Sequence, residues 1–67
     1  MEIDLDAIRY IRRKFEGERA RFMEILTGGS PKTYDEYKEV IGTIRGLALG
    51  DQILSDLETT LRKNQDE

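Results

Sequence analysis

One short segment, Thr27-Gly-Gly-Ser-Pro31, interrupts the helical spacing of the apolar residues and divides the sequence into two halves. A glycine pair followed by proline is typical of a helix end, because glycine adopts the left-handed conformation and proline cannot continue a helix. On both sides of the segment the apolar residues recur mainly at three- and four-residue spacing, the period of an amphipathic helix. The sequence therefore predicts an all-α fold, an antiparallel two-helix hairpin with helices at about 4–27 and about 34–63.

Both predicted helices carry recognisable end signals. Asp4 or Asp6 is a candidate cap for the start of the first helix, and Gly28 is the candidate for the left-handed residue that closes it. Thr33 and Glu36 match the capping box, in which a hydroxyl and a carboxylate each accept a hydrogen bond from a backbone N–H of the other residue. The second helix should therefore begin at about residue 34.

The chain is short, since 67 residues form one domain at most and bury too little surface to be more than marginally stable. Small scaffolds often rely on disulfides or a metal, but the sequence has no cysteine, no histidine and no calcium-binding loop. We expect self-association or docking on a larger protein instead. The predicted organisation is one domain over residues 1–67, with an inter-helix loop at 28–32 and a frayed tail at 64–67.

The charge pattern weighs against two classes of role. A net charge of −3 does not favour a general nucleic-acid binder, although it does not exclude one. No apolar run approaches the roughly 18 residues of a membrane span, and the acidic N-terminus differs from the basic start of a signal peptide. We therefore expect no membrane contact and synthesis in the cytoplasm.

The densest positive run is a basic cluster in the first helix, formed by Arg9, Arg12, Arg13 and Lys14. Acidic residues three or four positions away can pair with it along the same helix, namely Asp6, Glu16 and Glu18. We expect a solvated, ion-paired face. The alternative is that Arg9, Arg12 and Arg13 contact an anionic partner, either a nucleic acid or an acidic protein. Glu18 and Arg19 also interrupt the apolar stripe, which argues against a regular heptad coiled coil.

Three glycines, Gly42, Gly46 and Gly50, recur every four residues inside the second predicted helix. Each costs about 1 kcal/mol relative to alanine in a helix interior, so a compensating role is expected. Residues four apart lie on one side of a helix and would form a smooth groove. Either Phe15 and Phe22 of the first helix fill this groove, or the groove receives another protein or another copy of the chain. The charged flanks exclude the membrane version of this pattern.

The second predicted helix is either continuous or broken near residue 50, and its length decides whether its far end is covered. Gly50 followed by Asp51 is also a plausible stop-and-start pair, which would break the helix there. A continuous helix would be about 45 Å long and would extend some two turns beyond the first. Its far end would then be partly uncovered and available to a partner, with Leu54, Leu57 and Leu61 as the candidate contacts.

Two tyrosines, Tyr34 and Tyr37, open the second helix and either pack on the loop or present their rings to a partner.

No residue combination suggests catalysis. The paired carboxylates Asp35 and Glu36 lie beside no histidine, cysteine or other nucleophile, and there is no phosphate-binding loop or metal-ligand spacing. We therefore expect no enzyme, with no catalytic residue, cofactor or metal.

Residues 34–47, YDEYKEVIGTIRGL, resemble a pattern, Tyr-x-x-Tyr-x-x-x-x-Gly-x-Ile-x-Gly-Leu, of very short helical proteins encoded in the head and tail structural gene clusters of tailed bacteriophages. The matched positions are Tyr34, Tyr37, Gly42, Ile44, Gly46 and Leu47, whereas Gly50 lies outside the match. The resemblance implies a virion component or assembly factor, made in the host cytoplasm and docked on a larger protein such as the portal, neck or capsid.

The sequence thus favours a non-enzymatic structural protein of a tailed-phage virion, with a larger virion protein or copies of itself as partner. The alternative is a small soluble regulator or inhibitor that binds one partner protein by laying a helix into a groove. The expected interaction residues are Gly42, Gly46, Gly50, Tyr34, Tyr37, Leu54, Leu57 and Leu61.

Overall fold

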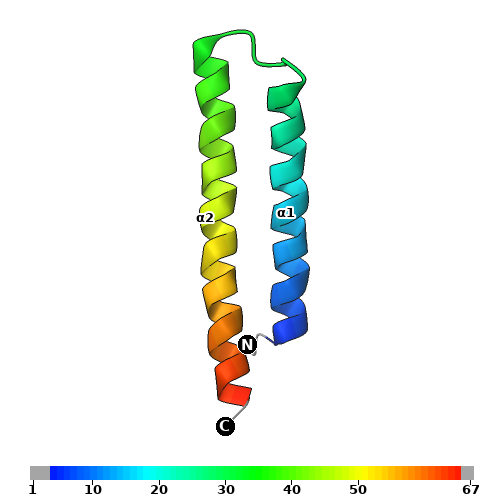
Figure 1. Cartoon of the computed structure of the whole chain (residues 1–67), viewed down its shortest axis with the longest axis vertical. Coiled ribbons are helices and arrows are strands. Elements are labelled where there is room, and N and C mark those ends of the chain that lie inside the picture. The colour runs from blue at the N-terminus through cyan, green and yellow to red at the C-terminus, as the bar shows by residue number, and fades with distance from the viewer. Residues whose placement is uncertain (1–3, 66–67) are drawn as a thin grey trace.

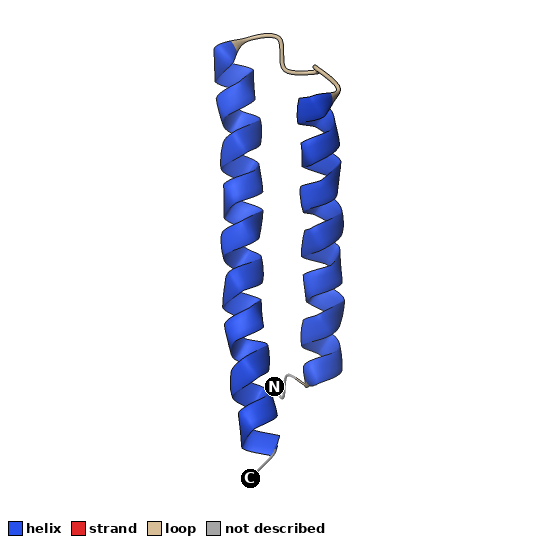
Figure 2. Ribbon diagram, in the orientation of Figure 1, coloured by secondary structure: helices blue, strands red, loops and turns tan. Residues whose placement is uncertain are grey.

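The computed structural model describes residues 4–65 and contains two α-helices, α1 at Leu5–Thr27 and α2 at Tyr34–Gln65. The helices run antiparallel, side by side along their length, and are joined by one loop (Figures 1 and 2). The molecule is an elongated rod measuring 52 × 20 × 15 Å. The predicted all-α two-helix hairpin is therefore confirmed.

The start and end of α1 are fixed by backbone and side-chain hydrogen bonds. Asp4 is the N-cap, and its carboxylate accepts a hydrogen bond from the backbone N–H of Ala7 at 2.7 Å. At the other end, Gly29 donates to Leu26 O and Ser30 donates to Ile25 O, each at 3.2 Å, which is the Schellman arrangement. The left-handed residue is Gly29, with φ of 76°, and not Gly28, which stays right-handed. The prediction for Gly28 was wrong by one position, because either glycine satisfies the sequence signal.

The start of α2 follows the capping-box prediction in one of its two bonds. The Thr33 hydroxyl accepts a hydrogen bond from the N–H of Glu36 at 3.1 Å. The Glu36 carboxylate accepts instead from the N–H of Lys32 at 2.9 Å, one residue before the position that the motif predicts. Glu36 thereby ties the loop, which ends at Thr33, to the first turn of α2.

The helix α2 is continuous through Gly50, so the alternative break between Gly50 and Asp51 does not occur. With 32 residues, α2 is about 48 Å long and extends beyond the 23-residue α1 at both ends (Figure 1). Asn64 and Gln65, the first two residues of the predicted tail at 64–67, belong to α2. Residues 66 and 67 lie outside the described residues.

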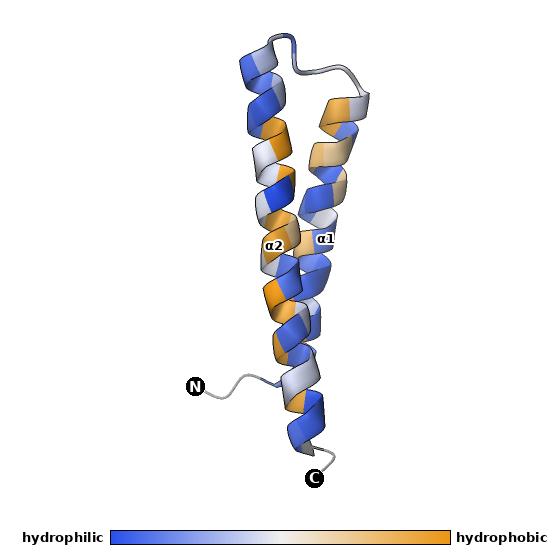
Figure 3. Ribbon diagram, turned by 60° about the vertical axis from the view of Figure 1, so that its left-hand side comes forward, coloured by the Kyte–Doolittle hydropathy of each residue, from blue (hydrophilic) through white to orange (hydrophobic). Residues whose placement is uncertain are grey.

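The contact between the helices is one layer of side chains thick. Among the described side chains, Ile8 alone is fully buried, with 0% of its surface exposed. Other apolar residues along both helices are half-buried, among them Phe15, Phe22, Val40, Leu47 and Leu54. In Figure 3, turned to bring α2 forward, apolar positions recur along the visible side of α2. Two helices alone cannot enclose more than such a narrow seam, so much of the apolar surface of this chain stays in contact with solvent.

Candidate interaction surfaces

Gly50 faces α1 and receives an aromatic ring. A Cβ atom built at Gly50 would lie 3.2 Å from Cζ and 2.9 Å from Cε1 of Phe15, and the second distance is shorter than real Cβ atoms show. The missing side chain therefore makes room for the Phe15 ring against the backbone of α2. Phe15 and Phe22 were expected to fill a groove along the three glycines. Phe15 makes this contact at Gly50.

Gly42 and Gly46 lie on the other side of α2 and are exposed. Apart from the helix itself, no atom of the described residues 4–65 would lie within 4 Å of a Cβ atom built at either position. Neither Phe15 nor Phe22 occupies this part of the helix. The three glycines therefore do not form one groove on α1, because a four-residue step advances about 40° around the helix and carries Gly50 onto the inner side.

Two large apolar residues lie beside these outer glycines and are strongly exposed, Leu49 by 64% and Ile53 by 60%. The spacing 42, 46, 49, 53 places all four residues within about 60° on one side of α2. We call Gly42, Gly46, Leu49 and Ile53 the outer stripe. Leu49 and Ile53 were missed as candidate residues at the sequence level. Their three- and four-residue spacing from Gly46 and from each other was the signal that could have identified them.

Two residues of the basic cluster of α1, Arg9 and Arg12, form ion pairs with carboxylates of α2. Arg12 donates from Nε to Asp51 Oδ1 at 2.9 Å, and from Nη1 to Glu58 Oε1 at 3.4 Å. Arg9 lies 3.9 Å from the Glu58 carboxylate. In the part of the chain that the structure describes, the cluster forms no ion pair with Asp6, Glu16 or Glu18, and Glu18 binds Arg21 instead. The expected pairing along the helix is thus replaced by pairing between the helices.

The Arg12 contact shifts the pKa values of both groups. The side-chain hydrogen bond from Arg12 holds the pKa of Asp51 below its ordinary value, and the positive charges of Arg12 and Arg19 act in the same direction against partial burial. The same bond raises the pKa of Arg12 further above its ordinary value. Arg12 therefore joins α1 to α2 within the hairpin. Arg13 is exposed and is accessible to an anionic partner. Arg9, Arg12, Arg13, Glu16 and Glu58 line a shallow depression of about 210 Å³.

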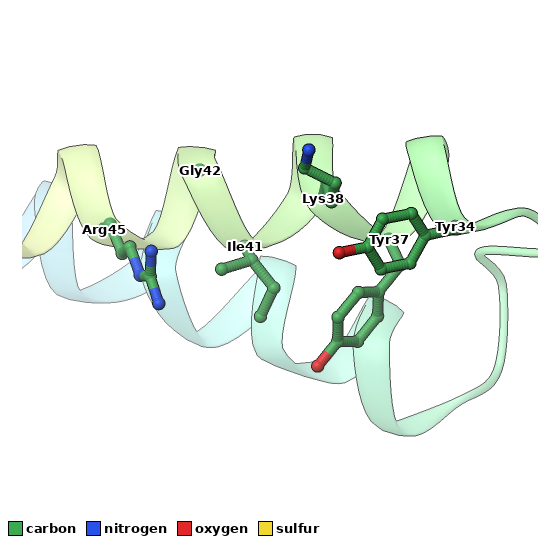
Figure 4. Close-up of a pocket in the computed structure, with 6 residues that line it drawn as sticks. All are labelled: Tyr34, Tyr37, Lys38, Ile41, Gly42 and Arg45. Carbon is green, nitrogen blue, oxygen red and sulfur yellow. The ribbon is translucent and has the colours of Figure 1, made fainter.

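A second depression, of about 330 Å³, lies at the beginning of α2 (Figure 4). Its lining consists of Tyr34, Tyr37, Lys38, Ile41, Gly42 and Arg45. Tyr34 is 73% exposed and Tyr37 45% exposed, and the Lys38 ammonium lies 5.5 Å from the centre of the Tyr34 ring. Two phenol rings, two cations and one aliphatic side chain make this an amphipathic surface, suited to a protein side chain with an apolar body and an acidic end. Neither tyrosine belongs to the core, so the structure places both at the surface end of the hairpin.

The three leucines near the end of α2 have an intermediate environment. Leu54, Leu57 and Leu61 are half-buried. The exposed apolar surface of α2 is accordingly centred on Leu49 and Ile53 and not on this leucine series.

Within residues 4–65, no group of acidic residues is arranged to hold a metal ion. Neither described helix has a stretch that is both long and apolar enough to cross a membrane. No family model, curated protein or solved structure matches this chain. The outer stripe of α2 and the tyrosine depression are therefore assigned as candidate interaction surfaces from their exposure and chemistry.

Proposed function

We propose that this chain is a non-enzymatic structural or assembly protein that acts through its helix faces. Its partner is a larger protein or further copies of the chain itself. The observation that carries the proposal is a contrast within the described residues 4–64: one side chain, Ile8, is fully buried, while the second helix exposes Leu49 and Ile53 by 60% or more. Exposed apolar surface of this kind, concentrated on one helix side, is characteristic of protein contact sites.

The chemistry of the surfaces supports docking and gives no support to catalysis. The strongest polar cluster, Arg12 with Asp51 and Glu58, joins α1 to α2 and is occupied in holding the hairpin. The tyrosine depression adds a second contact area at one end of the rod, where Tyr34 is 73% exposed. A partner that binds along α2 would cover both surfaces and stabilise the folded state by mass action.

The resemblance of residues 34–47 to short structural proteins of tailed bacteriophages directs the proposal to a virion, with the portal, neck or capsid as the docking partner. Of its matched positions, Tyr34, Tyr37, Gly42 and Gly46 are exposed, as a docking surface requires. Ile44 and Leu47 are half-buried and belong to the hairpin seam.

Mass spectrometry of purified particles tests this proposal directly. We expect the chain in the particles at a fixed ratio to one larger structural protein. Crosslinking of the particles should then join Lys38 or Lys32 to that protein, because both lysines are exposed near the tyrosine depression. If the chain is absent from particles throughout assembly but binds one soluble protein at equal stoichiometry, the regulator hypothesis replaces the virion one.

A further inference from the structure

We propose that the outer stripe of α2 binds the outer stripe of a second copy of this chain, with the two α2 helices antiparallel. This inference rests on the proposed function, since it treats helix faces as docking surfaces, and it names the occupant of one of them. The starting observation is the exposure of Leu49 by 64% and Ile53 by 60%, two large apolar side chains on one side of α2.

The order of large and small residues on the stripe is self-complementary in the antiparallel direction. Positions 42 and 53 have the same midpoint on the helix as positions 46 and 49. When two α2 helices cross antiparallel at that midpoint, Ile53 of each copy lies opposite Gly42 of the other, and Leu49 lies opposite Gly46. Among the residues that the structure describes, none places an atom within 4 Å of a Cβ built at either glycine, so each large side chain meets an open position.

The charges beside the stripe fit the same register. Lys38 and Asp56 flank the stripe on the same edge, and their midpoint differs from that of the stripe by half a residue. In the antiparallel arrangement Lys38 of one copy lies level with Asp56 of the other to within about 1.5 Å along the axis, and the two-fold symmetry repeats the pair. A parallel dimer in register would place Lys38 opposite Lys38 and Asp56 opposite Asp56. Charge complementarity therefore selects the antiparallel form.

Both charged groups are available for such a pair. Lys38 and Asp56 are exposed, and about 27 Å of helix separates them within one chain, so they cannot pair intramolecularly. Asp56 accepts one hydrogen bond, from Gln52 Nε2 at 3.0 Å, which leaves further acceptor capacity on its carboxylate. The resulting dimer is a row of four helices with the two α2 helices in the middle.

The first test is the molar mass of the isolated chain as a function of concentration, measured by light scattering and sedimentation. We expect the wild-type chain to form a dimer, and Leu49→Asp to weaken the association by about tenfold or more. Met23→Asp is the matched control, because Met23 is 49% exposed on α1, off the stripe, and should leave the dimer intact. Circular dichroism of each variant verifies that the helices remain. A wild-type chain that stays monomeric at millimolar concentration, or an equal effect of the two variants, overturns the proposal.

The second test is a charge exchange. Lys38→Glu and Asp56→Lys should each weaken the dimer by placing like charges opposite each other, and the double variant should restore the wild-type affinity. Because the two residues are too far apart to meet within one chain, such a rescue reports a contact between chains. A double variant that associates no better than the single variants contradicts the antiparallel register.

The third test uses the absence of cysteine from the sequence. Gly42→Cys chains mixed with Ile53→Cys chains should form mixed disulfides, because these positions face each other in the dimer. Ile53→Cys chains alone should crosslink poorly, since the two cysteines would lie about 16 Å apart. Efficient crosslinking of Ile53→Cys to itself would establish a parallel pair and overturn the assignment.

The outcomes also separate this inference from the proposed function. A chain that is found in particles but whose isolated form is a monomer retains the assembly role and loses the dimer. A dimer that passes all three tests but is absent from particles retains the stripe contact and loses the virion role.

Discussion

Gly46 and Gly50 are two glycines about one turn of α2 apart, and their surroundings differ: one faces away from α1 and the other faces it. Gly50 faces α1, and the Phe15 ring lies so close that a Cβ atom would approach it to 2.9 Å. Gly46 faces outward with nothing within 4 Å of the same atom. The inner glycine is thus explained by packing inside the hairpin, whereas the outer glycine has no role in the isolated chain. Glycines of one four-residue repeat can therefore have different surroundings on the same helix, and the outer one belongs to the surface that we propose as a contact site.

Ile8→Ala has the largest expected effect, because Ile8 is the one fully buried side chain among the residues that the structure describes. Large-to-small changes at buried isoleucine cost about 2–5 kcal/mol, a large part of the stability of a chain this short. We expect a strong fall in the denaturation midpoint measured by circular dichroism. Ile11→Ala, at a position that is already 39% exposed, is the control and should cost clearly less. Equal losses would mean that the hairpin has no localised core.

Gly50→Ala and Gly46→Ala test whether the two glycines differ in how much space surrounds them. Both variants gain about 1 kcal/mol of helix propensity, so the difference between them isolates the contact with Phe15. We expect Gly50→Ala to be less stable than Gly46→Ala by about 1–3 kcal/mol, the usual cost of overpacking. The measurement is urea denaturation at a concentration where light scattering gives the mass of one chain. Indistinguishable stabilities would show that Phe15 moves aside without cost.

Asp51→Asn probes the polar part of the inner side through its pH dependence. The pKa of Asp51 is lowered in the folded state by Arg12, so the carboxylate stabilises the hairpin at pH values above its unfolded pKa of about 3.9. This contribution is lost as the pH falls through the lowered folded pKa. Wild type should therefore exceed Asp51→Asn in stability at neutral pH, and the two should converge in acid.

The matched control for Asp51 is Glu18→Gln, which removes an exposed pair with Arg21 within α1. We expect a change of at most about 0.5 kcal/mol, because exposed pairs at this spacing contribute little. If Glu18→Gln lowered the free energy of unfolding as much as Asp51→Asn, the ion pair between the helices would be no stronger than an exposed pair within α1.

Tyr34→Ala has the smallest expected effect on stability, because the side chain is 73% exposed. Thermal denaturation should give a midpoint close to that of the wild type. The same variant should lose affinity for a partner that covers the tyrosine depression, as measured by capture from disrupted particles. A marked loss of folding would instead assign Tyr34 to the hairpin itself.

Much of this fold follows from local sequence. The apolar spacing, the Gly28-Gly29 pair and the Thr33 and Glu36 cap specify two helices and a tight reversal, because these signals act over one or two turns. The position of the left-handed glycine was wrong by one residue, since the local signal fits both glycines. The ion pairs of Arg12 could not be predicted, because its partners Asp51 and Glu58 lie 39 and 46 residues away along the chain.

The candidate surfaces divide in the same way. Tyr34, Tyr37, Gly42 and Gly46 were identifiable as interaction candidates from residue type and spacing, and they lie exposed. Leu49 and Ile53 were not identified, because an apolar residue in an amphipathic helix is ordinarily expected to face the partner helix. Their exposure depends on which side of α2 packs against α1.

Local sequence specifies the two helices, their approximate ends and the reversal between them, since these depend on short-range hydrogen bonding and on the period of the apolar residues. Which side of α2 faces α1 is established by the packing of the two helices. That rotation brings Gly50 against Phe15 and Arg12 against Asp51, and it leaves Gly46, Leu49 and Ile53 outside. The physical reason is that α2 carries apolar residues around most of its circumference, while a single neighbouring helix can cover only one side.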